Sequence, residues 1–590
     1  MFIAKVHQLL ISPLEKKLHS HLIFWFALSF TFALSYSFLA LKQAFSSPYL
    51  IQDDARQHVF WMMRFIDPEL FPNDLIANYF QSVAPAGYSF LYKLGTIVGI
   101  NPFVFSKIIP LFLCLICTYY AFKITLEILP IPLAGFITTL VMNQGIWMKD
   151  DLVSATPRAF AYPLFLAFLY YVLRQSKIGV CLSIALLGLF YPHYVFVSLG
   201  ILCLRLITWE KGKLSWVKNV SDYGLSGAGF LVGFLILLPY ALTSSEYGPA
   251  LTKAEAMQFR EFFPHGRSTF FHVRPQDFWL TGKRSGMFPK SLFTPATQCA
   301  SLFLPLILAW RRPFPLLKEL TSGIWLIFHL LISSITLFFI AHAVLFKLHL
   351  PSRYTGISFR IIVAIGTGIV CTVLIDALFQ WLTVHRFKNS DKINLVKFGI
   401  SLSIISLMLA ALVLYPAFVK GFPLARYKQG NAIKLYEFFQ QQPKDIIIAS
   451  LEEEVNQLPS FTQRSILVGR EYAIPYQVGY YQQFQQRVFD LITAQYSPNL
   501  ADVQSLINKY DIDFWMLHRG AFTPEYLANN SWLMQFENTQ TALNLIKSGQ
   551  LPALAQVMTQ CPVFLDQNLI VLDAHCLLNP EKNRVPGAGE

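Results

Sequence analysis

Two adjacent carboxylates, Asp53 and Asp54, closely follow the first long apolar segment of the chain. The run continues through Arg56 and His58, so an acidic pair is followed by a guanidinium and an imidazole. A carboxylate can accept a proton from a hydroxyl group, and a cation can stabilise developing negative charge. We therefore predict the chemical centre here. The competing interpretation is that the pair caps a helix or keeps a loop in water.

Other ionisable residues fall in segments that the topology described below places at the same membrane face. Asp150 and Asp151 precede Arg158. His193 and Tyr194 follow Pro192 at a bend between two apolar runs, and His265 lies in a later connection. Carboxylates opposite cations predict a cleft with an acidic end and a phosphate-binding end. The alternatives are a helix cap for the second acidic pair, a membrane-surface anchor for Arg158 and simple packing for the bend. The candidate cations are Arg158, Arg267, Arg274 and Arg353, and the candidate lining residues are His58, His193, Tyr194 and His265.

The composition is that of a membrane protein. Of the 590 residues 54% are hydrophobic and only 14% are charged, whereas soluble domains carry about 25% charged residues. Several stretches are long enough to cross about 30 Å of hydrocarbon. The first is too long for a cleaved signal peptide. We predict a mostly α polytopic membrane protein of about eleven spans, at 22–41, 103–122, 130–148, 159–173, 178–191, 193–208, 224–243, 297–310, 322–346, 361–383 and 398–419.

The net charge of +13 is read as cytoplasmic loop charge rather than nucleic-acid binding. With the N-terminus inside, basic residues such as Arg174, Arg205 and Arg311 fall in inside connections. Eleven spans then place the C-terminus outside, whereas treating 178–208 as one tilted helix would invert the later loops. The connection 244–296, placed outside, carries seven Lys and Arg residues, against the rule. We interpret these cations as serving an anionic ligand.

Residues 421–590 are more polar than residues 1–420 and predict a separate extracytoplasmic α/β domain. Strands are expected at 445–450, 465–469 and 514–517, and a helix at 501–510. Cys561 and Cys576 lie in this part, where an oxidising compartment would allow a disulfide. Cys114 and Cys117 sit in an apolar run, where packing is the expected role.

The chain resembles the GT-C superfamily of membrane glycosyltransferases, in its many spans, long first outer loop, second long outer loop and outer C-terminal domain. The run from Asp53 to His58 resembles the acidic motif early in that family's first outer loop, with Asp54 where many members carry Glu. It looks closest to the bacterial branch similar to protein mannosyltransferases and lipid A aminoarabinose transferases. The resemblance implies Asp53 as catalytic base or acceptor-orienting carboxylate, with Asp54 as the second catalytic candidate. Asp150 and Asp151 have no residue-by-residue match in the family pattern.

This resemblance implies transfer of a sugar from a polyprenyl-phosphate donor to an acceptor hydroxyl at the outer face of a bacterial inner membrane, with inversion. The acceptor is left open between lipid, glycan and protein, and no nucleic acid is expected. A divalent cation, Mg or Mn, is left open as the one cofactor, held by Asp54, Asp150 and Asp151. The main alternative is a transporter or flippase of a lipid-linked or anionic solute. Crowding of charge at one face and the lack of a visible repeat count against it. A scaffold that binds envelope components is the third hypothesis.

Overall fold

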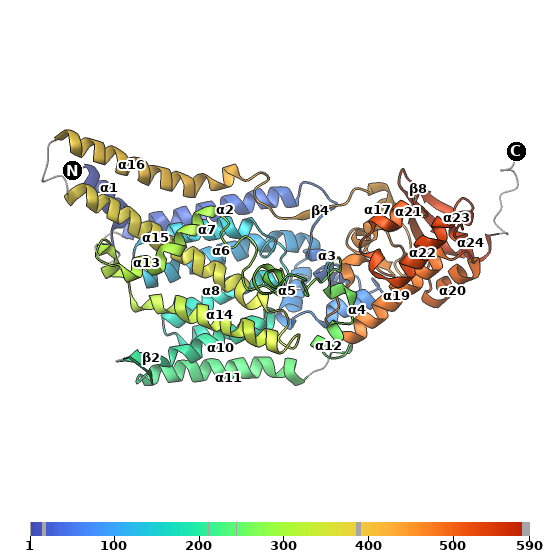
Figure 1. Cartoon of the computed structure of the whole chain (residues 1–590), viewed down its shortest axis with the longest axis horizontal. Coiled ribbons are helices and arrows are strands. Elements are labelled where there is room, and N and C mark those ends of the chain that lie inside the picture. Colours follow the sequence, from blue (N-terminus) through green and yellow to red (C-terminus); the bar gives the residue numbers. More distant parts are fainter. Residues whose placement is uncertain (1, 14–18, 211, 243–244, 385–390, 581–590) are drawn as a thin grey trace.

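The computed structural model describes residues 2–13, 19–210, 212–242, 245–384 and 391–580. Long apolar helices run side by side, and a smaller unit built from the C-terminal residues lies beyond one end of this bundle (Figure 1). The N-terminal helix α1 (Phe2–Ile11) and the hairpin of β2 (Ile207–Glu210) and β3 (Lys213–Trp216) lie at the opposite end. The bundle therefore lies between the C-terminal unit and these N-terminal and hairpin elements.

Each predicted span coincides with helical structure. Six helical segments in the described part of the chain are long and apolar enough to cross a membrane, so the chain is an integral membrane protein. The other segments are shorter, and the count of eleven spans stays a prediction. The bundle consists of α2 (His19–Ala44), α6 (Pro102–Ile128), α7 (Pro132–Trp147), α8 (Pro157–Leu173), α9 (Lys177–Phe190), α10 (His193–Arg205), α11 (Val220–Leu242), η4 (Ala296–Phe303) with α13 (Leu304–Ala309), α14 (Trp325–Ala343), α15 (Ser352–Val384) and α16 (Asp391–Leu414).

Two local features of the bundle bear on the polar residues at its end. Helices α9 and α10 are separate, because Pro192 between them has no N–H to continue the helical ladder. Helix α15 packs closely on α7 at Gly368, where a Cβ would collide with the Thr138 hydroxyl and lie 2.7 Å from the Ala134 carbonyl oxygen. A larger residue would push apart the two helices that carry polar residues toward the same end.

The connections between α2 and α6 and between α11 and η4 form short elements between the bundle and the C-terminal unit (Figure 1). Strand β1 pairs antiparallel with β4, with Ile51 opposite Lys428, which fixes the start of the first connection against the chain leaving α16. The elements are β1 (Leu50–Gln52), α3 (Ala55–His58), η1 (Phe60–Phe65), α4 (Leu75–Ser82) and α5 (Ala86–Ile97), then α12 (Lys253–Ala256), η2 (Arg260–Phe262) and η3 (Asp277–Thr281), and finally η8 (Tyr415–Phe418) and β4 (Tyr427–Gln429).

The C-terminal unit contains a five-stranded mixed sheet in the order β6-β5-β7-β9-β8. Strand β5 is parallel to β6 and β7, and β9 is antiparallel to β7 and β8. The predicted strands and helix are present here, and the disulfide Cys561–Cys576 is formed, while Cys114 and Cys117 are free and buried. The strands are β5 (Ile447–Ala449), β6 (Ser465–Ile466), β7 (Phe514–His518), β8 (Pro562–Leu565) and β9 (Leu569–Asp573), and the main helical elements are α17 (Ile433–Gln440), η9 (Glu453–Gln457), α18 (Leu458–Phe461), η10 (Arg470–Tyr472), α19 (Val478–Tyr496), α20 (Leu500–Tyr510), α21 (Pro524–Asn529), α22 (Glu537–Lys547), α23 (Ala553–Val557) and α24 (Ala574–Leu578).

Candidate active site

The acidic pair lies in the tight turn between β1 and α3. The side-chain oxygen of Gln52 accepts hydrogen bonds from the backbone N–H groups of Asp54 and Ala55, at 2.8 and 3.3 Å. Asp54 occupies the position before α3, but its side chain makes no capping bond. Because Gln52 accepts from these two backbone N–H groups, the carboxylates of Asp53 and Asp54 are not needed to cap them and contact other partners. The capping interpretation of the pair is therefore wrong.

Arg158 is the common partner of three carboxylates. Pro157 begins α8, where a fixed φ favours the first helical turn, and this places Arg158 at the helix start. Its Nη2 lies 2.7 Å from Asp54 Oδ2, 3.2 Å from Asp151 Oδ1 and 3.9 Å from Asp150 Oδ1. We call Asp54, Asp150 and Asp151 the carboxylate group. One guanidinium thus ties the first connection to the segment before α8.

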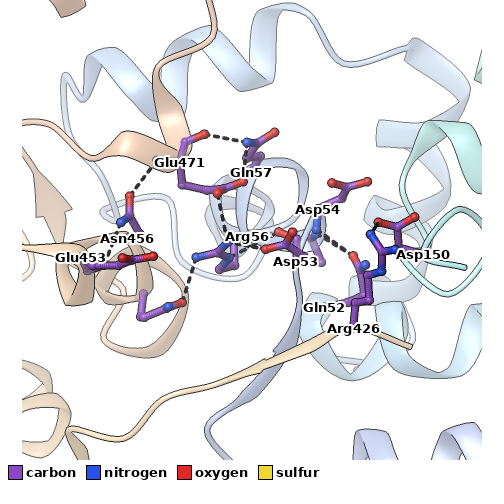
Figure 2. A network of polar contacts seen from close by, with 12 residues as sticks. Gln52, Asp53, Asp54, Arg56, Gln57, Asp150, Arg426, Glu453, Asn456 and Glu471 are labelled. Atoms are coloured by element: carbon purple, nitrogen blue, oxygen red, sulfur yellow. Dashed lines mark hydrogen bonds and ion pairs between the residues drawn. The ribbon is translucent and has the colours of Figure 1, made fainter. Parts of the chain in front are cut away.

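Two further arginines neutralise the carboxylate group. Arg360, from α15, forms an ion pair with Asp151 and donates to the Tyr162 hydroxyl at 3.0 Å. Arg426 lies 3.2 Å from Asp150. Three carboxylates therefore face three guanidinium groups. In Figure 2 the Asp54 side chain lies between those of Asp53 and Asp150.

Lys149 lies beside this cluster but does not add to its charge at neutral pH. The residue is 5% exposed, and its Nζ donates to the Ser291 carbonyl at 2.9 Å. Burial, together with the charge of Arg360, lowers the pKa of Lys149 to about 6 despite the nearby Asp151 and Asp150. The amine is therefore largely uncharged at pH 7.

The electrostatic environment keeps Asp54 ionised. Burial by itself would raise the pKa of this carboxyl, but the charges of Arg158, His58, Lys283 and Arg267 outweigh burial, and its pKa lies below the ordinary value. Burial lowers the pKa of His58 to about 4 in spite of Asp54. At neutral pH the site therefore holds an anionic Asp54 and a neutral imidazole.

The carboxylate group does not fit a metal site as the structure arranges it. A divalent cation needs several oxygen ligands directed at one point, but the cation shared by these three carboxylates is the Arg158 guanidinium. Within the described residues, no three His, Cys, Asp or Glu side chains are placed to hold a metal ion. The predicted ligands Asp54, Asp150 and Asp151 come together, but around an arginine.

Lys283, Arg284 and Arg353 form a second set of charges, which we call the cation group. Lys283 interacts with Asp54 and Arg353 with Asp151, and Arg284 interacts with both of these cations. The backbone joins its parts, because Ser352 N donates to Arg284 O at 3.3 Å and Ser352 Oγ donates to Lys283 O at 3.1 Å. Among the residues that the structure describes, none of the three has a carboxylate within 4.0 Å.

Two histidines beside the cation group stay uncharged at neutral pH because burial and the nearby cations disfavour their protonation. The His193 and His349 rings lie 4.9 Å apart beside this group. Burial lowers the pKa of His349, and the charges of Arg353 and Arg284 lower it further, with His193 also contributing. Burial and the neighbouring arginines also lower the pKa of Arg284. Excess positive charge with no internal counterion favours the binding of an anion.

The remaining predicted site residues divide into three cases. Arg267 is paired with Glu471. His193 lies beside the cation group, and His58 lies beside the carboxylate group. Arg274 and His265 are exposed, with His265 in a turn at φ 75°, and neither has an ion pair within the described part. Tyr194 is fully buried, and its hydroxyl bonds Ser358 N at 3.1 Å, which joins α10 to α15. The structure thus places Tyr194 in the core rather than on the site.

Sequence reasoning missed Glu471, in η10 of the C-terminal unit. Its carboxylate pairs with Arg56 (Figure 2). It also pairs with Arg267, and Gln57 Nε2 donates to its Oε1 at 2.6 Å. The local signal was slight, because Arg470-Glu471 after a short strand looks like an exposed charged turn. Only the docking of the C-terminal unit reveals the contact.

No family model and no curated protein matches the sequence. Among solved structures, the apo form of the Archaeoglobus fulgidus oligosaccharyltransferase aligns with a TM-score of 0.54 and 11% identity, covering 92% of this chain and 73% of that one. AglB from the same organism, in complex with an inhibitory peptide and a dolichol-phosphate, aligns with a TM-score of 0.51 and 11% identity, covering 90% and 72%. The chain has the fold of the GT-C superfamily. ArnT from Cupriavidus metallidurans bound to undecaprenyl phosphate aligns with a TM-score of 0.45 and 12% identity, covering 94% of this chain and 98% of that one.

Proposed function

We propose that this GT-C-fold protein is a membrane glycosyltransferase that moves a sugar from a polyprenyl-phosphate donor to an acceptor hydroxyl. The observation that carries the proposal is the cation group, which lies beside an ionised Asp54 and has no carboxylate partner in the described part of the chain. A lipid phosphate would supply the missing negative charge. The fold likeness to AglB, which has been solved with a dolichol-phosphate, supports this class of donor.

The reaction we propose is a single displacement. The acceptor hydroxyl loses its proton to a carboxylate oxygen as it attacks the anomeric carbon of the sugar. The bond from that carbon to the phosphate oxygen breaks, and the phosphate leaves with the bonding electrons. Lys283, Arg284 and Arg353 would stabilise the charge on the leaving phosphate. One attack from the opposite face inverts the anomeric centre and needs no second, nucleophilic carboxylate.

Asp54 is the better placed of the two catalytic candidates. Its charge interacts with Lys283 of the cation group and with Arg158, which it shares with Asp150 and Asp151. Asp53 instead forms an ion pair with Arg56, on the side toward the C-terminal unit. We therefore propose Asp54 as the carboxylate that accepts or orients the acceptor proton, and Asp53 as a residue that holds Arg56.

We propose that residues 1–420 form the membrane catalytic domain and residues 421–590 an extracytoplasmic domain of a bacterial inner-membrane protein, with eleven spans and a cytoplasmic N-terminus. Two observations support this orientation. Helix α1 and the C-terminal unit lie at opposite ends of the bundle (Figure 1). The disulfide Cys561–Cys576 suits an oxidising compartment. A reporter fused after residue 590 should be active only outside the cytoplasm; cytoplasmic activity would overturn the orientation.

The deciding experiment gives the purified protein in lipid vesicles a labelled polyprenyl-phosphate sugar and hydroxyl acceptors of three kinds: lipid, glycan and protein. Label should move to one acceptor class, and free polyprenyl phosphate should appear in equal amount. Movement of intact labelled donor across the vesicle membrane, with no chemical transfer, would instead support a transporter or flippase. Binding without transfer or movement would support a scaffold. Arg274→Gln is the control, because this arginine is exposed and lies outside the cation group.

A further inference from the structure

Glu471 is a buried carboxylate that the C-terminal unit contributes to the end of the bundle. The residue is 8% exposed. Its Oε2 lies 3.0 Å from Arg56 Nη2, and its Oε1 forms an ion pair with Arg267 Nη2. Arg56 comes from the first connection and Arg267 from the connection after α11. One carboxylate thus joins three segments that are far apart in the sequence.

Each of these arginines also interacts with one of the candidate catalytic carboxylates. Arg56 Nη2, which contacts Glu471, also forms an ion pair with Asp53 (Figure 2). Burial raises the pKa of Asp54, and Arg267 is one of the groups that hold it below its ordinary value, after Arg158, His58 and Lys283. Glu471 therefore sets where two cations stand relative to the acidic pair.

The position of Glu471 is fixed from every side. Gln57 Nε2 donates to its backbone oxygen and to its Oε1, each at 2.6 Å, and its backbone N donates to Asn456 Oδ1 at 2.8 Å. Arg56 Nη1 also donates to Gln457 at 3.3 Å. A buried charge with this many partners is held in one geometry, and removing one partner leaves the others uncompensated.

We propose that Glu471 is a positioning residue for the transfer reaction, through which the C-terminal unit completes the active site by sharing Arg56 with Asp53 and by holding Arg267 out of contact with Asp54. This inference rests on the proposed glycosyltransferase function. Without the Glu471 charge, both guanidinium groups would be drawn more fully to Asp53, Asp54 and the donor phosphate. The acceptor-side carboxylate would then be a weaker base, while donor binding would not suffer.

The test compares Glu471→Gln with the parent protein in the labelled-donor assay. The expected result is a fall in kcat of about tenfold to a hundredfold, as for misplaced active-site groups, with the KM for donor unchanged or lower. The acid limb of the kcat profile should move to lower pH by about one unit, because a nearby negative charge has been removed. Asp490→Asn is the matched control, since Asp490 pairs with Lys509 at 2.7 Å within the same unit.

A second variant keeps the proposal testable if Glu471→Gln fails to fold. Gln57→Ala removes both donated hydrogen bonds to Glu471 without changing any charge, and should lower kcat in the same direction by a smaller factor. If the parent transfers sugar and both variants keep its kcat and pH profile, Glu471 has no positioning role. A rise in donor KM with an unmoved pH profile would also overturn the proposal, since it indicates general damage. If the parent transfers nothing, the proposed function itself fails.

Discussion

The carboxylate group and the cation group lie side by side, but they differ in charge balance. Asp54, Asp150 and Asp151 are matched by Arg158, Arg360 and Arg426. Lys283, Arg284 and Arg353 have no such matches among the described residues. A balanced cluster holds its own geometry, whereas an unbalanced one has an electrostatic reason to bind an anion. On this difference we base the proposal that the first group serves the acceptor and the second binds the donor phosphate.

The strongest way to break this comparison is Asp54→Asn. The variant keeps the shape of the side chain but removes the negative charge that we expect to receive the proton. Transfer should fall by about a hundredfold to a thousandfold in kcat, as for loss of a general base, with donor KM little changed. The rate of label transfer at saturating donor measures this. A variant that retains the parental rate would remove Asp54 from the chemistry.

The cation group predicts the opposite kinetic signature. The double variant Lys283→Gln and Arg353→Gln removes two charges that have no carboxylate within 4.0 Å in the described part. Each charge-assisted contact with phosphate is worth about 1.5–3 kcal/mol, so loss of two should raise donor KM by about a hundredfold or more, with the acceptor KM unchanged. Arg274→Gln, from the same connection as Lys283, should leave both constants at parental values. Equal effects of the two changes would show that no specific phosphate site exists.

Asp53→Asn sharpens the distinction within the acidic pair. Asp53 pairs with Arg56, which Glu471 also holds, so the arginine keeps a carboxylate partner in the variant. We expect kcat to fall by only about threefold to tenfold, the effect of a disturbed contact rather than a lost base. Parallel assays of Asp53→Asn and Asp54→Asn decide between them. The assignment is reversed if Asp53→Asn is the more damaging change.

The sequence was sufficient to predict what depends on local pattern. Apolar runs predicted the positions of the helices, because hydrocarbon thickness sets their length. The grouping of Asp54, Asp150, Asp151 and Arg158 at one end also followed, since helix order decides which connections share a face. The GT-C fold was indicated by the same large-scale arrangement.

Sequence alone could not predict how the charges would pair. Arg158 and Arg267 were predicted as phosphate-binding residues, and the sequence did not indicate their carboxylate partners: Arg158 pairs with Asp54, and Arg267 pairs with Glu471 of the C-terminal unit. Tyr194 follows His193 in the chain, yet a helix turns neighbouring side chains to different faces, so the tyrosine packs in the core. Pairing depends on side-chain geometry between distant segments, which no local pattern encodes.

Lys149 offers a test of the charge balance of the carboxylate group that does not depend on enzyme activity. Three arginines already match the three carboxylates, so a charged lysine would be in excess, and burial lowers its pKa to about 6. Between that value and the ordinary lysine pKa of about 10.4, the unfolded chain binds one more proton than the folded protein. Stability therefore rises with pH across this window by up to about 1.4 kcal/mol per unit from this residue.

Lys149→Met should remove that contribution. The variant leaves the Ser291 carbonyl without its donor, a cost that does not vary with pH. The difference in unfolding free energy, variant minus parent, should therefore be most favourable to the variant near pH 6 to 7 and decline steadily toward pH 10. Thermal unfolding in detergent at pH 6.5, 7.5, 8.5 and 9.5 measures it. Parallel curves for the two proteins would mean that Lys149 is charged in the folded state, and that the carboxylate group carries one more cation than its three arginines.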